Sequence, residues 1–219
     1  MPEISLSCGN AVTSITIKQL LLKGLFLFFL FTAICMHINA QDTSRHYSIS
    51  ICGKPQYLHL IELNNGNVQG FVEVIFDKRK KLKSYKSNEI RIKTPLSEPE
   101  VAALYDKLDS AGINSLKQCQ EDMECKEIDF LHADFLIIDL THQHEKKHFE
   151  YQAIHPINKE NSNIEKTQLR KKIQEIISMV GSEISLERKY SDVVKNLKDG
   201  YYCYFEGISF ACIIKKKKK

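Results

Sequence analysis

The stretch from Phe130 to His155 constrains the fold more than any other, because its residue pattern must specify either a helix or a β-hairpin. Residues 148–153 alternate polar and apolar side chains, which is the period of a half-buried strand. Residues 135–138 form an apolar run that is typical of a central strand buried on both faces. Residues 141–147, between these segments, are polar and would give a helix no apolar stripe. The sequence therefore predicts a β-hairpin.

The predicted turn of this hairpin lies near Glu145 and Lys146. The resulting register aligns apolar residues on one face of the two strands, pairing Leu140 with Tyr151 and Ile138 with Ala153.

Residues 144–148 read His-Glu-Lys-Lys-His and resemble, over these five positions, the H-E-x-x-H motif of zinc metalloproteases. The resemblance implies a zinc-dependent hydrolase in which His144 and His148 bind the metal and Glu145 activates its water. That chemistry requires a helix, because only there do residues i and i+4 share a face. The predicted hairpin points His148 away from His144, and the metzincin spacing places a third histidine where Ile154 stands. The zinc hydrolase is therefore the alternative, and the leading interpretation assigns no catalytic residue, no metal ligand and no cofactor.

Residues 1–40 have the order of a secretory signal peptide, in which two lysines precede an apolar core and Ala40 precedes a polar stretch. The apolar run is short for a bilayer span, so we expect cleavage and no integral membrane span afterwards. The predicted location is exported, in the periplasm, at the cell envelope or outside the cell. The alternative is an uncleaved N-terminal anchor. Lipid attachment at Cys35 is disfavoured because the large residue Ile34 precedes it.

Five cysteines remain in the mature chain, and an oxidising compartment favours their pairing. Cys119 and Cys125 lie in one polar loop and can pair with each other. A type II′ turn at residues 207–208 would place Cys203 directly opposite Cys212 in a hairpin. We therefore predict these two disulfides and an unpaired Cys52. Buried free thiols are the open alternative, because sequence alone does not fix connectivity.

The positive net charge comes from the end of the chain. Without residues 1–40, 29 basic and 26 acidic side chains remain, and five of the basic ones are the lysines of residues 215–219. The sequence therefore predicts a basic C-terminal tail on a nearly neutral body. A lysine run can bind an anionic membrane or nucleic acid by charge alone, but such runs are more often solvated ends. We expect no nucleic-acid partner.

A second hairpin is predicted between residues 57 and 76, because Asn65 and Gly66 favour a type I′ turn. This turn would pair Leu63 with Val68 and His59 with Val72. It places six residues on one face, namely Tyr57, Ile61, Leu63, Val68, Val72 and Val74.

Helices are predicted in three places. Residues 97–100 form a capping box, and apolar residues then recur at helical spacing up to Gly112. Residues 169–180 and 190–197 show the same spacing. The order of the elements predicts an α+β fold, with a mainly antiparallel sheet built from hairpins and two or three amphipathic helices packed on it. We expect a single domain at residues 41–214.

The sequence contains no G-x-S-x-G, Walker A or dinucleotide-binding glycine motif, so it gives no support to those enzyme classes. We therefore expect a small exported domain that is not an enzyme and that binds another protein or remains at the cell envelope. A protein that inhibits another or neutralises a toxin belongs to the same binding class.

Overall fold

The computed structural model describes residues 43–82, 87–126, 128, 134–143, 145–157, 162–206 and 209–216. The predicted signal peptide, His144, the turn at residues 207–208 and the last three lysines lie outside these residues. Residues 43–219 form one compact unit. Its strands pair antiparallel in a single sheet with helices packed on it, which confirms the predicted α+β class.

The described part of the chain contains eight strands and several helices. The strands are β1 (Thr43–Ser50), β2 (Gln56–Leu63), β3 (Val68–Arg79), β4 (Ser87–Pro95), β5 (Phe135–His142), β6 (Glu145–Gln152), β7 (Gly200–Glu206) and β8 (Ser209–Lys215). The α-helices are α2 (Glu98–Ser110), α3 (Met123–Lys126), α4 (Gln168–Glu183) and α5 (Leu186–Asn196), and short 3₁₀ turns occur at Ile113–Ser115 and Cys119–Glu121.

The strand order is β6-β5-β1-β2-β3-β7-β8, with β4 paired to β3. β3 is long enough to pair with two strands along one edge. Its first half pairs with β2, its last three residues pair with β7, and β4 pairs along the other edge. The hairpin β7–β8 therefore extends the sheet beyond the end of β2.

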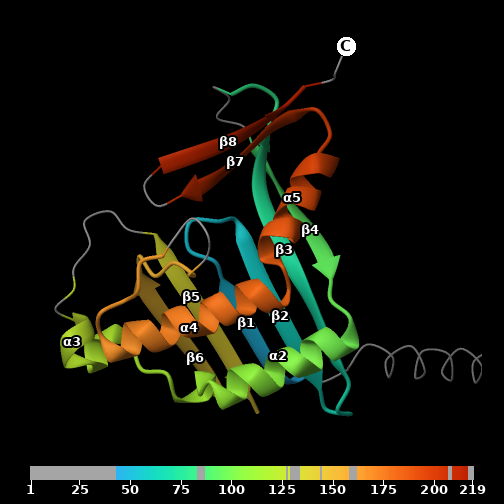
Figure 1. Ribbon diagram of the computed structural model, residues 1–219. Helices are drawn as coiled ribbons and strands as arrows, with labels where there is room; N and C mark the ends of the chain where they lie inside the picture. The colour runs from blue at the N-terminus through green and yellow to red at the C-terminus, as the bar shows by residue number, and fades with distance from the viewer. Residues whose placement is uncertain are drawn as a thin grey trace, which may run out of the picture. The chain divides into compact units, whose positions relative to one another are not determined.

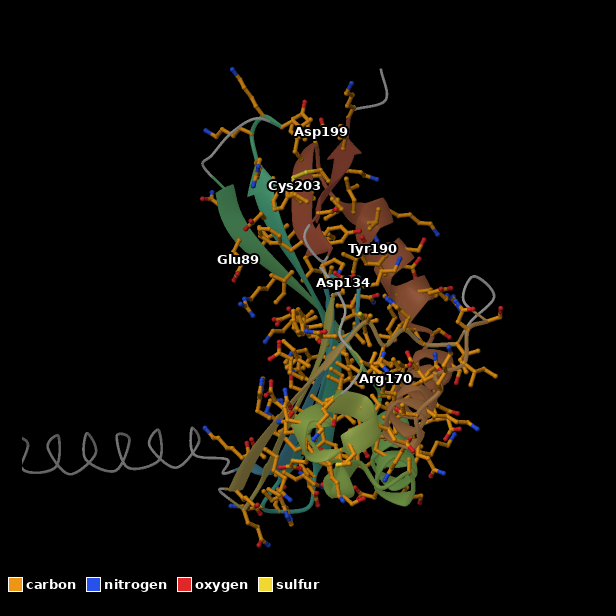
Figure 2. The ribbon with its side chains drawn as sticks, turned by 90° about the vertical axis from the view of Figure 1, so that its left-hand side faces the viewer. Glu89, Asp134, Arg170, Tyr190, Asp199 and Cys203 are labelled. Carbon is orange, nitrogen blue, oxygen red and sulfur yellow. A yellow bond between two sulfur atoms is a disulfide. The ribbon has the colours of Figure 1, made fainter. Side chains whose placement is uncertain are left out.

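The helices cover one face of the sheet. In Figure 1, α2 and α4 lie across one face of β1, β2, β5 and β6, and α5 lies along β3 and β4. In the side view of Figure 2 these helices stand on the same side of the sheet, and none of the described helices lies on the other side. Among the described helices, none is both long and apolar enough to cross a membrane.

Two clusters of buried side chains hold these layers together. The larger lies between the sheet and the helices α2 and α4, and includes Tyr47, Leu58, Leu104 and Ile173. The smaller packs Val193 of α5 against β3 and β7, where it meets Val74, Phe76 and Tyr202. The predicted helical spacings account for the buried faces, since Val101, Leu104, Tyr105 and Leu108 of α2 are all buried.

The hairpin β2–β3 differs by one residue from the predicted register. The Gly66 N–H donates to the Leu63 carbonyl at 2.8 Å, and the Leu63 N–H donates to the Asn67 carbonyl at 2.9 Å. Gly66, whose φ is +81°, is therefore the last residue of a three-residue loop and not the second of a two-residue turn. Val72 consequently pairs with Leu58 and not with His59.

This slip of one residue exchanges the two faces of β2. Leu58 and Leu60 are buried under the helices, whereas Tyr57, His59 and Ile61 lie on the opposite side. The prediction that Tyr57 and Ile61 share a face with Val72 and Val74 is therefore wrong, because an Asn-Gly pair is compatible with both loop lengths.

The hairpin β5–β6 forms as predicted, but its turn lies earlier. Ile138 pairs with Phe149 and Leu136 with Tyr151, so the predicted partners of Leu140 and Ile138 were wrong. This register buries both aromatic rings in the core, whereas the predicted one would have placed Phe149 opposite His142, next to the turn. The strand β5 is buried on one face and not on two, because no described helix covers its other side.

A candidate binding face on the uncovered side of the sheet

We call the side of the sheet that carries none of the described helices the open face. Side chains reach it from six neighbouring strands, because residues that alternate with the core positions point outward. These outward side chains include His46, His59, Ile61, Phe71, Glu73, Arg91, Lys93, Asp139, His148 and Glu150. In Figure 2, Glu89 of β4 lies on this side of the sheet, away from the helices.

The centre of the open face is a row of stacked rings. His59 stacks on Phe71 with ring centroids 4.7 Å apart, and His46 stacks on His59 at 5.5 Å. The His46 Nε2 lies 3.3 Å from the His59 Nδ1, so one ring donates a hydrogen bond to the other. These three residues are half-buried, although no helix covers them, because each ring covers its neighbour.

Burial sets the charge state of the two histidines. Burial lowers the pKa of His59, and the nearby imidazole of His46 lowers it further. Burial also lowers the pKa of His46, against the opposing effect of the Asp139 carboxylate. Both rings are therefore neutral at pH 7, and the centre of the face is uncharged.

A buried carboxylate lies beside this row. Glu73 is 4 % exposed, and its carboxylate accepts a hydrogen bond from the Arg91 guanidinium at 3.1 Å. The Lys93 ammonium lies 3.8 Å from the other oxygen of Glu73 and 4.4 Å from the centre of the Phe71 ring. Glu73 thus orients two cations whose charged ends remain in contact with water, since both side chains are more than half exposed.

The opposite side of the open face is bordered by β5 and β6. The His148 Nδ1 lies 2.6 Å from a carboxylate oxygen of Asp139, and its Nε2 lies 4.0 Å from Glu150. All three side chains are exposed. The open face therefore has a half-buried ring centre with charged groups of both signs around it.

The described residues of the zinc motif lie on a strand and not on a helix. Glu145 and His148 belong to β6, Glu145 is exposed near Lys147, and His144 lies outside the described residues. Among the described residues, no group of three or more metal-ligating side chains is close enough to hold an ion. Because the motif requires a helix, the zinc alternative gains no support from this geometry.

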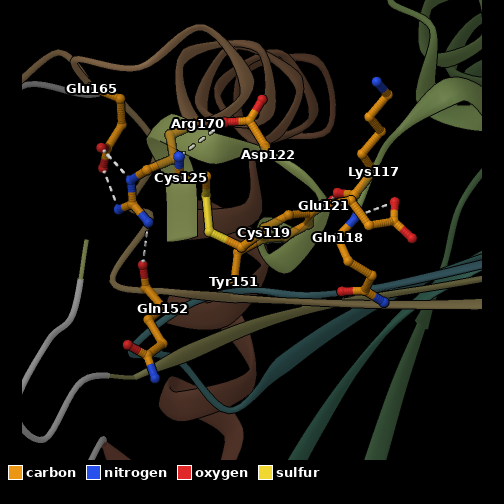
Figure 3. Close-up of a disulfide and its surroundings, with 10 residues drawn as sticks. All are labelled: Lys117, Gln118, Cys119, Glu121, Asp122, Cys125, Tyr151, Gln152, Glu165 and Arg170. Atoms are coloured by element: carbon orange, nitrogen blue, oxygen red, sulfur yellow. Dashed lines mark hydrogen bonds and ion pairs between the residues drawn. A yellow bond between two sulfur atoms is a disulfide. The ribbon is translucent and has the colours of Figure 1, made fainter. Parts of the chain in front are cut away.

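Both cysteine pairs singled out in the sequence are disulfides in the structure. Cys203 and Cys212 are directly paired residues of β7 and β8. Cys119 and Cys125 join the 3₁₀ turn at Cys119–Glu121 to α3, as Figure 3 shows. The Tyr151 hydroxyl donates to the Lys117 carbonyl at 2.6 Å, which ties this loop to β6.

Arg170 holds α4 against the end of β6. Its guanidinium is 1 % exposed, donates to both carboxylate oxygens of Glu165 at 2.7 and 2.9 Å, and donates to the Gln152 carbonyl at 2.9 Å. Figure 3 shows this group beside the disulfide. Both features therefore serve the structure of the covered side of the sheet.

Cys52 is free and buried, and its sulfur lies 3.9 Å from the His155 Nε2. A cysteine beside a histidine can act as a nucleophile if the thiolate is favoured. Here burial raises the pKa of the Cys52 thiol to about 12, and the charge of Asp134 adds to that effect. The thiol therefore stays protonated at neutral pH, which is the state of a packed core residue.

A cavity of about 630 Å³ lies between β4 and the junction of α4 with α5. Its lining includes Glu100, Arg188 and Asp192, of which the last two are exposed. The Glu100 carboxylate is already held by the Ser97 N–H and hydroxyl at the start of α2. On the open face, Arg91 and Lys93 are instead ordered around a buried carboxylate, so we assign the candidate function to the open face.

The sequence prediction did not single out His46, His59, Phe71, Glu73 or Arg91. The slip in the β2–β3 register turned His59 toward the core, so the histidine row was not recognised. The available signal was the segment from Tyr57 to Ile61, where two leucines alternate with a tyrosine, a histidine and an isoleucine. Comparison of the chain with protein family models, curated proteins and solved structures gave no match.

Proposed function

We propose that the protein is an exported domain that binds a partner protein through the open face. The observation that carries this proposal is the half-buried row of His46, His59 and Phe71 with charged groups around it, on the side of the sheet that no described helix covers. Protein interfaces have this composition, with aromatic residues and arginine enriched and a polar rim around a buried centre.

The arrangement of Arg91 and Lys93 indicates the chemistry of the partner. Their contacts with Glu73 restrict both long side chains before binding, which lowers the entropy lost when a partner fixes them. Their exposed N–H groups can still donate hydrogen bonds to a carboxylate of the partner. We therefore expect a partner surface with acidic side chains opposite β4 and apolar side chains opposite Phe71 and Ile61.

The state of the cysteines supports an exported, non-catalytic domain. The two disulfides use four of the five cysteines of residues 41–219, and disulfides of this kind persist in oxidising compartments. The remaining thiol, Cys52, has a raised pKa and lies in the core, so its environment supports a packing role rather than a nucleophilic one.

Site-specific photo-crosslinking in the native cell tests the proposal. A photoreactive phenylalanine at Ile61, on the open face, should give one defined adduct, and the same probe at Glu175, exposed on α4, should give none. The purified adduct partner should then bind the unmodified protein with a 1:1 stoichiometry in calorimetry.

Charge reversal at Lys93 tests its contribution to binding, and charge reversal at Lys171 is the matched control. Lys93→Glu should weaken binding of the purified partner at least about tenfold, since a like-charge contact replaces an opposite-charge one. Lys171→Glu on α4 should leave the affinity unchanged. Equal adducts from Ile61 and Glu175, or equal affinities for the two charge-reversal variants with normal melting curves, would refute binding through the open face.

A further inference from the structure

We propose that the hairpin β7–β8 docks on the surface of an anionic lipid membrane. The docking surface consists of three apolar side chains, Phe205, Phe210 and Ile214, and of the neighbouring cations Arg79, Lys80, Lys81 and Lys216. This proposal does not depend on the partner-binding function of the open face.

The apolar part of this surface is unusually exposed. Phe205 is 71 % exposed, Phe210 37 % and Ile214 48 %. The two phenylalanine rings contact each other edge to face with centroids 4.9 Å apart, because Phe205 and Phe210 are directly paired. An exposed group of large apolar side chains marks a surface that is covered in the functional state.

The other face of the same hairpin explains why these side chains face outward. Tyr202, Tyr204 and Ile213 alternate with them along the strands and pack on Phe76 and α5. The Cys203–Cys212 disulfide lies on the same side of the hairpin as the phenylalanines, with Cys203 itself buried, and it fixes the two strands to each other. The hairpin therefore presents its phenylalanines on a rigid support.

Positive charge lies along the same hairpin and along the end of β3 that pairs with it. The Arg79 guanidinium lies 4.3 Å from the centre of the Phe210 ring. Arg79 pairs with Tyr201 of β7, the exposed Lys80 and Lys81 follow it, and the exposed Lys216 follows β8. Lys78 and Lys215 are directed to the helix side, where the Lys78 ammonium lies over the Tyr202 ring and the Lys215 ammonium donates to the Lys195 carbonyl at 3.3 Å. Four cations therefore remain at this end of the molecule for an anionic surface, namely Arg79, Lys80, Lys81 and Lys216.

This combination fits a lipid surface better than an acidic protein or a nucleic acid. Exposed phenylalanine side chains can enter the boundary between headgroups and acyl chains, and lysine and arginine beside them bind anionic headgroups. Stable attachment to a membrane needs two such contributions together, and the hairpin supplies both. In Figure 1 the hairpin lies at the end of β3 that is remote from α2, so a flat surface can reach it.

Co-sedimentation of the oxidised protein, residues 41–219, with vesicles measures the docking. We expect binding to vesicles in which roughly a third of the lipid is phosphatidylglycerol and the rest phosphatidylcholine, and much weaker binding to pure phosphatidylcholine. The double variant Phe205→Ser/Phe210→Ser should lower the partition coefficient at least about tenfold, since two apolar side chains no longer enter the interface. Lys80→Glu/Lys81→Glu should lower it by more than about twentyfold.

The chain offers a matched control for each variant. Phe135→Ser removes another exposed phenylalanine, and Lys146→Glu/Lys147→Glu reverses another exposed lysine pair, both at β5 and β6. Both controls should bind vesicles as the unmodified protein does. Equal binding to the two vesicle types, or an equal loss in a variant and its control, would refute the proposal. Tight binding to double-stranded DNA that the phenylalanine variant retains would also refute the proposal, since positive charge alone would then account for the binding.

Discussion

Gly70 of β3 lies against Val101 of α2, and its replacement by alanine measures how tightly the helix packs on the sheet there. A Cβ at this position would lie 2.8 Å from a Val101 methyl carbon and 2.9 Å from the His59 carbonyl oxygen. Favourable contacts between carbon atoms are about 3.5–4.0 Å long, so the new methyl group would have to displace its neighbours. Val101 has a stiff β-branched side chain on a helix, and the His59 oxygen belongs to the backbone.

The helix must therefore move away from β3, which costs about 1–3 kcal/mol for an overpacked core position. Urea denaturation followed by circular dichroism should show Gly70→Ala unfolding at a lower urea concentration with an unchanged slope. Gly181→Ala in α4 is the matched control, because nothing lies within 4 Å of the added Cβ. It should stabilise the protein by up to about 1 kcal/mol, since alanine favours a helix more than glycine does.

A double-mutant cycle decides whether the contact with Val101 causes the effect. Val101→Ala alone should be destabilising by about 2 kcal/mol, because it leaves a cavity. With the methyl group removed, Gly70→Ala should cost at least about 1 kcal/mol less than it does in the unmodified protein. Additive effects of the two substitutions, or a Gly70→Ala variant as stable as the unmodified protein, would refute the steric argument.

Three further perturbations test other features. Arg170→Met should lower the free energy of unfolding by about 3 kcal/mol in a urea titration, because the part-buried Gln152 carbonyl and Glu165 carboxylate lose their donor; a loss below 1 kcal/mol would contradict this. Replacing Cys203 and Cys212 by serine should cost about 2–3 kcal/mol under oxidising conditions, and a thermal melt in reductant should show no difference from the unmodified protein. The lowered pKa of His46 and His59 means that the unfolded chain binds protons first as the pH falls. Stability should therefore decrease below about pH 6.5, where free histidine titrates, and His46→Gln/His59→Gln should flatten that part of the stability profile.

The elements with strong local signals could be predicted from the sequence. The capping box at residues 97–100 fixes the start of α2, and the recurrence of Val101, Leu104 and Leu108 identifies its buried side. The pairing of Cys203 with Cys212 follows from the length of their hairpin. In each case the interacting residues lie close together in the chain, so their spacing carries the information.

The open face could not be predicted, because it depends on register. Asn65 and Gly66 suit a two-residue turn and a three-residue loop equally well, and the difference of one residue decides which side of β2 meets the helices. The contacts of Glu73 with Arg91 and Lys93 depend in turn on the pairing of β3 with β4. Hydrophobic periodicity does not report such cross-strand contacts between polar residues.

The position of β1 between β2 and β5 has a consequence for how the chain folds. β1, β2, β3 and β4 form a meander of local contacts, whereas the pairing of Tyr47 with Leu140 joins residues about ninety positions apart. When the N-terminal end of the chain is synthesised first, one edge of β1 remains unpaired until β5 is available. An unpaired strand edge can pair with a strand from another chain. The interval before β5 docks is therefore when the chain is most prone to aggregate. The rate of that docking, rather than formation of the early hairpins, should set the overall folding time.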